Sequence, residues 1–346
     1  MSKPRTRGLL VGGTRYGDPR TQAIHHCLDL LDLDLDSDES EPARIPLDFL
    51  AHGFAPHPRR AEAALLEKRG PGGAYVDLAA RVVLGRIDPL PGHHFYGHGA
   101  FTRDGGALLA VETDLETRDG VISVRDPRSF AVIDTFPTFG QAPHDCALIE
   151  DGRTLVITNG GGPIGRDDDD SMPCVAFVDV ATQKLLDRHV VDDARINTGH
   201  VAVDRDRSFI VVSAPRDGLP DTALGGVSLR SKGGPLRYAT EPAAVTSRMI
   251  GESLSVAIHA PSRTALCTHP YGHLITFWNL DTGALFGALD LPNARGVTLT
   301  LDQRYFAVSY GPAASLLLIQ TAPLRPVLDR DPGTRRFSGS HVYAWG

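Results

Sequence analysis

The sequence predicts an all-β protein, a seven-bladed β-propeller whose last blade is closed by pairing the C-terminal strand with the N-terminal strands. Two observations predict this fold. A unit of four short strands recurs along the chain at intervals of roughly 40 to 55 residues, which is the length of a propeller blade with its loops. The two ends of the chain carry the pieces of one further unit. Residues 1–346 are therefore expected to form one domain without a linker.

Taken in chain order, the first pieces are three strands around RGLLVGGTRY, QAIHHCLDLLDL and ARIPLD. The first complete unit begins at His52; its segment from Arg60 to Glu67 looks locally helical, but the repeat assigns it to a strand. The clearest unit runs from His98 to Phe136. Its apolar stretches ALLAVET, GVISVRD and AVIDTF follow a first strand, and Asp-Gly and Asp-Pro pairs mark the turns.

Four more units begin near His144, His200, Ser255 and Gly296. The last predicted strand is HVYAWG, which starts at His341. Together with the three N-terminal strands it completes a seventh blade. Such a closure is favourable because it leaves no open sheet edge between the first and last blades.

Composition argues against several classes of function. The net charge of −7 disfavours a nucleic-acid or anionic-membrane surface, because such surfaces need clustered Lys and Arg. No apolar run approaches a membrane span, and the one after the basic start is too short for a signal-peptide core. The four cysteines have neither CxxC spacing nor the density of a disulfide scaffold, so we expect reduced thiols. These features predict a cytoplasmic protein, and they leave its oligomeric state open.

Histidine is the unusual residue, with 14 in a chain that has only 2 Trp. The first strand of each propeller blade lines the central channel, so the residues that open these strands form a ring at one mouth. Two openings carry Ser255 and Gly296. The others carry histidine: His52, His98, His144, His200 and His341. Alignment on the following turn leaves Asp145 as an alternative to His144 in this ring.

Imidazoles that converge without carboxylates suit copper, iron, zinc or nickel, whereas magnesium and calcium prefer oxygen ligands. We therefore expect some subset of the five histidines to hold a transition metal ion, copper or iron first and zinc as a further candidate. The alternative interpretation is structural. A Gly-His pair before the first strand of a WD-repeat blade forms hydrogen bonds within its own blade, and Gly97-His98 and Gly199-His200 resemble such pairs.

The loops between second and third strands emerge on the same face as the ring. They would surround it with a rim of mixed charge that includes Lys68 and Arg69. The candidates for proton transfer or substrate contact at this mouth are His93, His94, Glu112, Asp145, His269 and His273.

The run FYGHGAF from Phe95 to Phe101, the Pro143-His144-Asp145 motif and the segment HVAVD from His200 resemble an uncharacterised bacterial propeller family, known only as a domain of unknown function. The resemblance extends from His52 to Pro312. Members of that family are usually exported with a twin-arginine signal and are associated with iron-uptake genes, which implies an iron-handling role. This sequence departs from the family in lacking that signal.

These observations predict a metal-dependent enzyme that carries out redox or oxygen-dependent chemistry on a small molecule at the channel mouth. A non-catalytic propeller that binds a protein or a metal ion through the same face is the alternative. A metal-dependent lyase or hydrolase is a third candidate.

Overall fold

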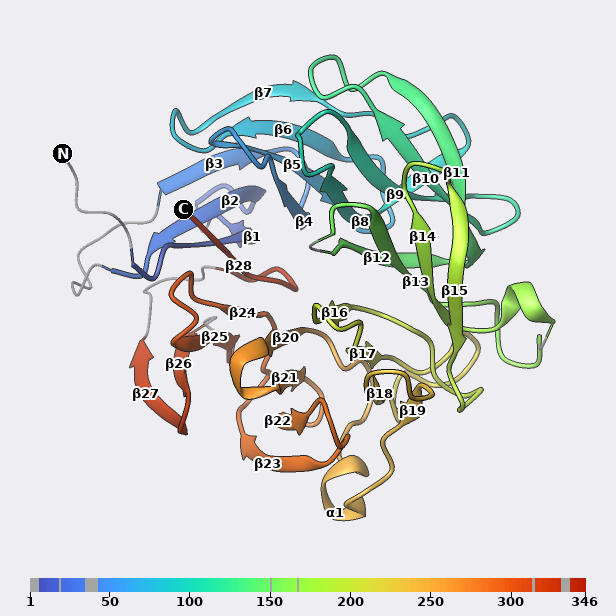
Figure 1. Cartoon of the computed structure of the whole chain (residues 1–346). Coiled ribbons are helices and arrows are strands. Elements are labelled where there is room, and N and C mark those ends of the chain that lie inside the picture. The colour runs from blue at the N-terminus through green and yellow to red at the C-terminus, as the bar shows by residue number, and fades with distance from the viewer. Residues whose placement is uncertain are drawn as a thin grey trace.

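Seven antiparallel sheets of four strands each surround a common axis (Figure 1). The structure is a computed structural model that describes residues 6–18, 20–34, 43–149, 151–166, 168–312, 315–330 and 337–346. The seven-bladed propeller predicted from the repeat is thereby confirmed. We number the blades from the N-terminus, and the strands of each blade are given from the axis outward.

The first three blades hold the N-terminal third of the chain. Blade 1 contains β28 (Tyr343–Trp345), β1 (Leu9–Gly17), β2 (Ile24–Asp32) and β3 (Ala43–Leu47). Blade 2 contains β4 (Ala51–Pro56), β5 (Glu62–Glu67), β6 (Gly73–Asp77) and β7 (Val82–Arg86). Blade 3 contains β8 (His93–Phe101), β9 (Leu108–Asp114), β10 (Asp119–Arg125) and β11 (Val132–Gln141). The Arg60 to Glu67 segment thus contributes a strand, β5, as the repeat predicted.

The remaining four blades follow in the same order. Blade 4 contains β12 (Pro143–Leu148), β13 (Thr154–Asn159), β14 (Cys174–Asp179) and β15 (Lys184–Val190). Blade 5 contains β16 (Val201–Val203), β17 (Phe209–Ser213), β18 (Gly226–Arg230) and β19 (Arg237–Tyr238). Blade 6 contains β20 (Val256–His259), β21 (Thr264–His269), β22 (Leu274–Asn279) and β23 (Leu285–Asp290). Blade 7 contains β24 (Val297–Leu299), β25 (Tyr305–Tyr310), β26 (Ser315–Thr321) and β27 (Leu324–Arg330).

The hydrophobic core lies between neighbouring blades. The middle strands β13 and β14 of blade 4 are buried along their whole length, whereas the outermost strand β15 is largely exposed. Between blades 2 and 3, Leu66 and Tyr75 pack with Phe95 and Leu108. A strand that packs on both faces needs apolar residues at successive positions, which explains the continuous apolar runs of the middle strands.

The ring closes in blade 1, where β1 pairs with both β2 and β28. Leu10 lies opposite Ala344 in the β1–β28 register. The fully buried Phe337 adds a second link, because its backbone N–H donates to Thr14 Oγ1 at 2.8 Å. This closure by both ends of the chain agrees with the sequence prediction.

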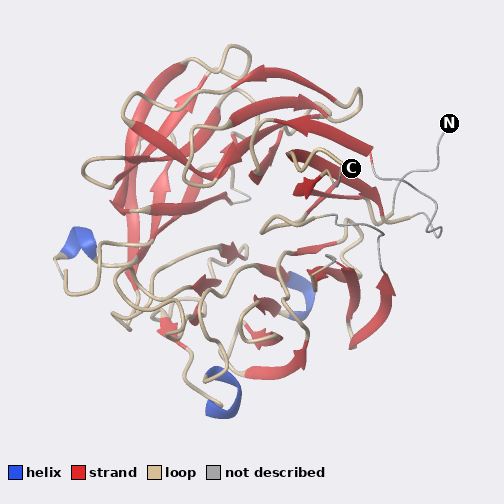
Figure 2. Ribbon diagram, turned by 180° about the vertical axis from the view of Figure 1, so that it is seen from behind, coloured by secondary structure: helices blue, strands red, loops and turns tan. Residues whose placement is uncertain are grey.

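Helical structure in the described residues is limited to α1 (Ala243–Thr246) and the 3-10 turns η1 (Asp169–Ser171) and η2 (Ala260–Ser262), which lie in loops between strands (Figure 2). None of these helices has the length and apolar character that crossing a bilayer requires. The four cysteines are buried and free.

Candidate metal centre

Three of the ring histidines lie where the innermost strand of their blade departs from regular pairing. The register with the second strand shifts between Ala51 and Gly53 in β4, and His52 is the residue in between. Equivalent shifts enclose His98 in β8 and His144 in β12. A β-bulge turns a side chain away from the regular alternation of the sheet. The bulges thus let these imidazoles meet at the axis.

The other two histidines stand just ahead of their inner strands. His200 immediately precedes β16, and its carbonyl accepts a hydrogen bond from the Val212 N–H at 2.9 Å. His341 precedes β28, the strand that closes the ring. A Cβ atom on Gly296 would lie 3.0 Å from the His341 Cα, so the small residue at this opening gives His341 its space.

The structure brings all five ring histidines together, and each is at most 7% exposed. One ring nitrogen from each of His52, His98, His144 and His200 lies within 4.8 Å of the others. The ring of His200 is central, with centroid distances of 4.4 Å to His144, 4.7 Å to His98 and 3.9 Å to His341. Five imidazoles from five different blades thus share one small volume.

The Nε2 atoms of this cluster have few partners within the protein. Those of His52, His98 and His341 are buried and accept or donate no hydrogen bond among the described residues. Those of His144 and His200 face each other at 2.9 Å. Burying an unpaired polar atom costs about 1–3 kcal/mol. Three such nitrogen atoms in one cluster therefore indicate that they bind a ligand.

Asp145 orients two of the rings. Its carboxylate oxygens lie 3.2 Å from His98 Nδ1 and 3.5 Å from His200 Nδ1, and Oδ2 also accepts the Val201 N–H at 3.1 Å. The carboxylate therefore favours the tautomer with hydrogen on Nδ1, which leaves the Nε2 lone pair directed into the cluster. The same arrangement orients histidine ligands in many metal sites.

Ser255 plays a similar part for the fifth ring. Its hydroxyl oxygen lies 3.4 Å from His341 Nδ1 and accepts the Val297 N–H at 3.2 Å. Asp145 and Ser255 each receive the first N–H of the inner strand in the next blade, so they occupy equivalent positions in the propeller. Asp145 thus holds the aligned position at the opening of blade 4, as the alternative alignment proposed. The His144 imidazole, one residue earlier, nevertheless joins the cluster, and the Asp145 carboxylate lies behind it.

Electrostatics keep the imidazoles neutral. Burial lowers the pKa of His98 and of His200 to about 3, and it lowers the pKa of His52, His144 and His341 well below the usual range. The nearby Lys68 ammonium lowers them further. Burial also raises the pKa of the Asp145 carboxyl group. Because a metal binds the unprotonated nitrogen, the histidines are ready for coordination at neutral pH.

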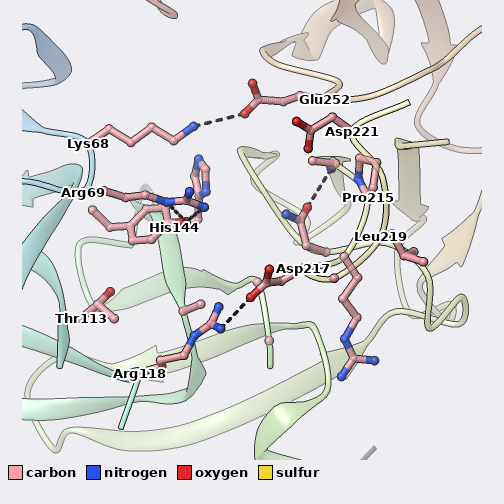
Figure 3. A pocket seen from close by; sticks show the side chains of 18 of the residues that line it. Lys68, Arg69, Thr113, Arg118, His144, Pro215, Asp217, Leu219, Asp221 and Glu252 are labelled. Carbon is pink, nitrogen blue, oxygen red and sulfur yellow. Dashed lines mark hydrogen bonds and ion pairs between the residues drawn. The ribbon is translucent and has the colours of Figure 1, made fainter. Parts of the chain in front are cut away.

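A pocket of about 500 Å³ leads from the surface to His144 (Figure 3). Tyr96 lines it with its ring centroid 4.9 Å from that of His144. Its hydroxyl group accepts hydrogen bonds from Arg69 Nε and Nη2 at 2.9 and 2.6 Å. Lys68 reaches across the pocket to Glu252, at 3.2 Å. His144 is thus the clustered histidine that borders this pocket.

Two of the proposed proton-transfer residues lie on the same face as this pocket. His94 lines it, and its buried Nε2 has no hydrogen-bond partner among the described residues. His93 lies beside the Asp114 carboxylate, with 3.7 Å between Nε2 and Oδ2, and its Nδ1 is 2.9 Å from the Pro91 carbonyl oxygen.

The structure does not bring the other three candidates to the cluster. Glu112 is fully buried inside blade 3, where it forms an ion pair with Arg125 at 2.6 Å and accepts a short hydrogen bond from Ser123. His269 is held in blade 6 between two hydroxyl groups, with Ser253 2.7 Å from Nδ1 and Thr276 2.8 Å from Nε2. His273 lies exposed in a turn and accepts the Asn293 N–H.

Comparison with known proteins supports this architecture. A family model described as "Protein of unknown function (DUF1513)" matches residues 45–329. No curated protein matches the chain. Hydrazine synthase from Kuenenia stuttgartiensis superposes with a TM-score of 0.66 at 13% identity, covering 93% of this chain and 97% of that chain. Dihydro-heme d1 dehydrogenase NirN in complex with DHE superposes with a TM-score of 0.57 at 15% identity, covering 95% and 74%. At these identities the likeness concerns the fold alone.

Proposed function

The chain belongs to the DUF1513 family of proteins of unknown function, and from its buried histidine cluster we propose that it is a metal-dependent enzyme. The metal is copper or iron, bound by imidazoles from His52, His98, His144, His200 and His341. The reaction is redox or oxygen-dependent chemistry on a small molecule that enters through the pocket. The observation that carries the proposal is the cluster of five buried, neutral imidazoles, three of which have an Nε2 without a hydrogen-bond partner among the described residues.

The donor set fits a single transition metal ion. All donors near the centre are imidazole nitrogens, which suit copper, iron and zinc, and the one nearby carboxylate faces the Nδ1 atoms instead. One ring nitrogen from each of four histidines lies within 4.8 Å of the others, and the His341 ring centroid is 3.9 Å from that of His200. The two structural neighbours are named as a synthase and a dehydrogenase, and both names denote enzymes.

Each part of the site has a defined task in this proposal. A metal ion bound here would supply the redox chemistry. The imidazoles would hold the ion, and Asp145 and Ser255 fix the orientation of three of their rings. Burial of all five rings would keep bulk water away from it. His94 lines the pocket and is the proposed proton donor or acceptor; its Nε2 is buried and has no hydrogen-bond partner among the described residues.

Elemental analysis of freshly purified protein tests the metal assignment. We expect near-stoichiometric copper or iron in the wild type, and at least tenfold less in a His98→Ala/His200→Ala variant that retains its circular dichroism. A His25→Ala/His26→Ala variant serves as the matched control, because it removes two adjacent histidines from β2, outside the cluster. It should bind metal like the wild type.

Two results would contradict the proposal. Wild-type protein from metal-supplemented medium that carries no transition metal would support histidines with a purely structural role. Full metal content in the His98→Ala/His200→Ala variant would place the metal elsewhere. Bound metal that ascorbate cannot reduce and air cannot reoxidise, or bound zinc, would favour a lyase or hydrolase over an oxidoreductase.

A further inference from the structure

We infer that the pocket above the histidine cluster binds the carboxylate group of a small monocarboxylate, and that Arg69 is the residue that recognises it. This inference rests on the proposed function, because it identifies the bound molecule as the substrate of the metal centre. It adds a substrate class and a specificity-determining residue that the cluster itself does not provide.

The backbone fixes Arg69 at the inner end of the pocket. It lies in the turn between β5 and β6, and the neighbouring Gly70 forms two backbone hydrogen bonds with Phe95 of β8. This pairing holds the turn against the strand that carries Tyr96. The Arg69 guanidinium carbon lies 5.2 Å from the centroid of the Tyr96 ring, and that ring in turn packs against His144.

Partners in the protein separate Arg69 from the other Lys and Arg side chains of the pocket. Arg216 is fully buried and donates its N–H groups to backbone carbonyl oxygens. Lys68 is paired with Glu252 at 3.2 Å, and Arg118 is paired with Asp217 at 2.7 Å. Figure 3 shows both pairs and the guanidinium of Arg69 near His144. Among the described residues no carboxylate forms an ion pair with Arg69, whose only hydrogen-bond partner there is the Tyr96 hydroxyl group.

A guanidinium that lacks an acid partner is a preferred binding group for carboxylates. It still has N–H groups to offer after the two that reach Tyr96. The other wall of the pocket carries the Asp221 carboxylate, which would repel a second negative charge on the ligand. These features together favour a molecule with a single carboxylate, bound at Arg69 and extending toward His144.

The test uses the full chain after metal removal with a chelator, so that binding does not depend on the metal centre. Ligand-observed NMR titrations compare acetate, pyruvate and benzoate with the matching neutral amides. We expect the carboxylates to bind and the amides not to. Arg69→Ala should weaken carboxylate binding by about tenfold or more, since it removes a charge-assisted contact. Arg69→Lys should cause an intermediate loss of carboxylate affinity, because lysine keeps the positive charge but lacks the planar guanidinium group.

Two controls separate recognition from structural support. Arg118→Ala/Asp217→Ala removes an ion pair from the rim of the same pocket without changing its net charge, so it should change affinity by less than about threefold. Tyr96→Phe removes the hydrogen-bond partner of Arg69 but keeps the guanidinium, so it should retain binding.

The inference is overturned if none of the three carboxylates binds, if the amides bind equally well, or if Arg69→Ala binds as tightly as the wild type. Equal losses of carboxylate affinity in the Tyr96→Phe and Arg69→Ala variants would also overturn it. Arg69 would then act only by holding Tyr96 in place. These outcomes do not depend on metal content. If no carboxylate binds in the NMR titration, the metal centre is still supported. If no metal is found, the pocket is still an anion-binding site.

Discussion

At the scale of single residues, the central feature is a carboxylate that serves two imidazoles at once. Asp145 lies behind His98 and His200 and is anchored by the Val201 N–H and, through its own N–H, by Thr158 Oγ1 at 2.9 Å. Burial of such a group is costly unless positive charge lies nearby. A metal ion held by the two rings would provide that charge.

Replacing this carboxylate should lower the metal affinity more than it lowers the stability of the fold. Asp145→Asn keeps the size of the side chain but removes the charge and one of two equivalent acceptors. We expect metal affinity to fall about 10- to 100-fold, which is typical for the loss of a group that orients a histidine ligand. Competition with a chromogenic chelator measures this affinity.

Asp77→Asn is the matched control for that measurement. Asp77 also accepts backbone N–H groups, from Ala79 and Ala80, but in a turn of blade 2 outside the cluster. It should leave metal affinity unchanged. Equal affinities for Asp145→Asn and the wild type would show that Asp145 has no part in orienting the ligands.

At the scale of elements, the bulges of the inner strands determine where the histidines point. The bulge in β8 places Gly97 at φ 109°, a conformation that residues with a side chain rarely adopt. A Cβ atom at this position would lie 2.4 Å from Cδ2 of His52. Gly97 therefore permits both the local geometry of blade 3 and the close approach of a ring from blade 2.

Gly97→Ala should consequently disturb stability and metal binding together. We expect a loss of about 1–3 kcal/mol in the free energy of unfolding, from backbone strain and the clash with His52, together with reduced metal content. Gly85→Ala in the outer strand β7 is the control. Gly85 has an ordinary φ and no neighbour within 4 Å of an added Cβ, so its change should stay within about 0.5 kcal/mol. Urea denaturation distinguishes the two, and similar values would refute the strain argument.

The strands and their pairing include features that the sequence predicts and features that it does not. Blade number, strand order and closure were predictable because turn-delimited strands repeat and because the ends supply one incomplete unit. The gathering of the histidines at blade openings followed from the same repeat. The bulges at His52, His98 and His144 could not be predicted, because a register shift changes pairing without a distinctive residue pattern.

The misplaced candidates have a related cause. Glu112 and His269 were assigned to the mouth because their strands end on that face, but the direction of each side chain was not known. In the structure both turn into the blades, where Arg125 satisfies the carboxylate and two hydroxyl groups satisfy the imidazole. Arg69 was assigned only to a charged rim, since its lack of an acid partner depends on contacts between blades.

At the scale of the whole molecule, burial of neutral imidazoles couples folding to pH. The pKa of His98 and of His200 is about 3 in the folded protein, against about 6.5 in an unfolded chain. Between these values the unfolded state binds more protons than the folded state, so acid favours unfolding. Stability of the metal-free protein should be constant above about pH 6.5 and fall as the pH decreases from there toward 3.

Each imidazole that stays neutral in the folded state contributes up to about 1.4 kcal/mol per pH unit to this slope. In the His98→Ala/His200→Ala variant, the free energy of unfolding should therefore change with pH less steeply than in the wild type, by up to about 2.8 kcal/mol per pH unit. Urea titrations of both metal-free proteins between about pH 7 and 5 give the two slopes. Parallel slopes would mean that these histidines do not remain neutral on acidification.

The closing strand β28 determines when, during synthesis, the set of clustered histidines becomes complete. Four of the five clustered imidazoles leave the ribosome with blades 2 to 5, but His341 arrives with β28, after every other blade has been made. A nascent chain therefore lacks the complete ligand set, however much metal surrounds it. In the finished molecule, an ion shared by His341 and the earlier histidines would tie the seam of blade 1 to four other blades. A bound metal ion would then indicate that the ring of blades has closed. It would also stabilise the closed seam of blade 1 against reopening.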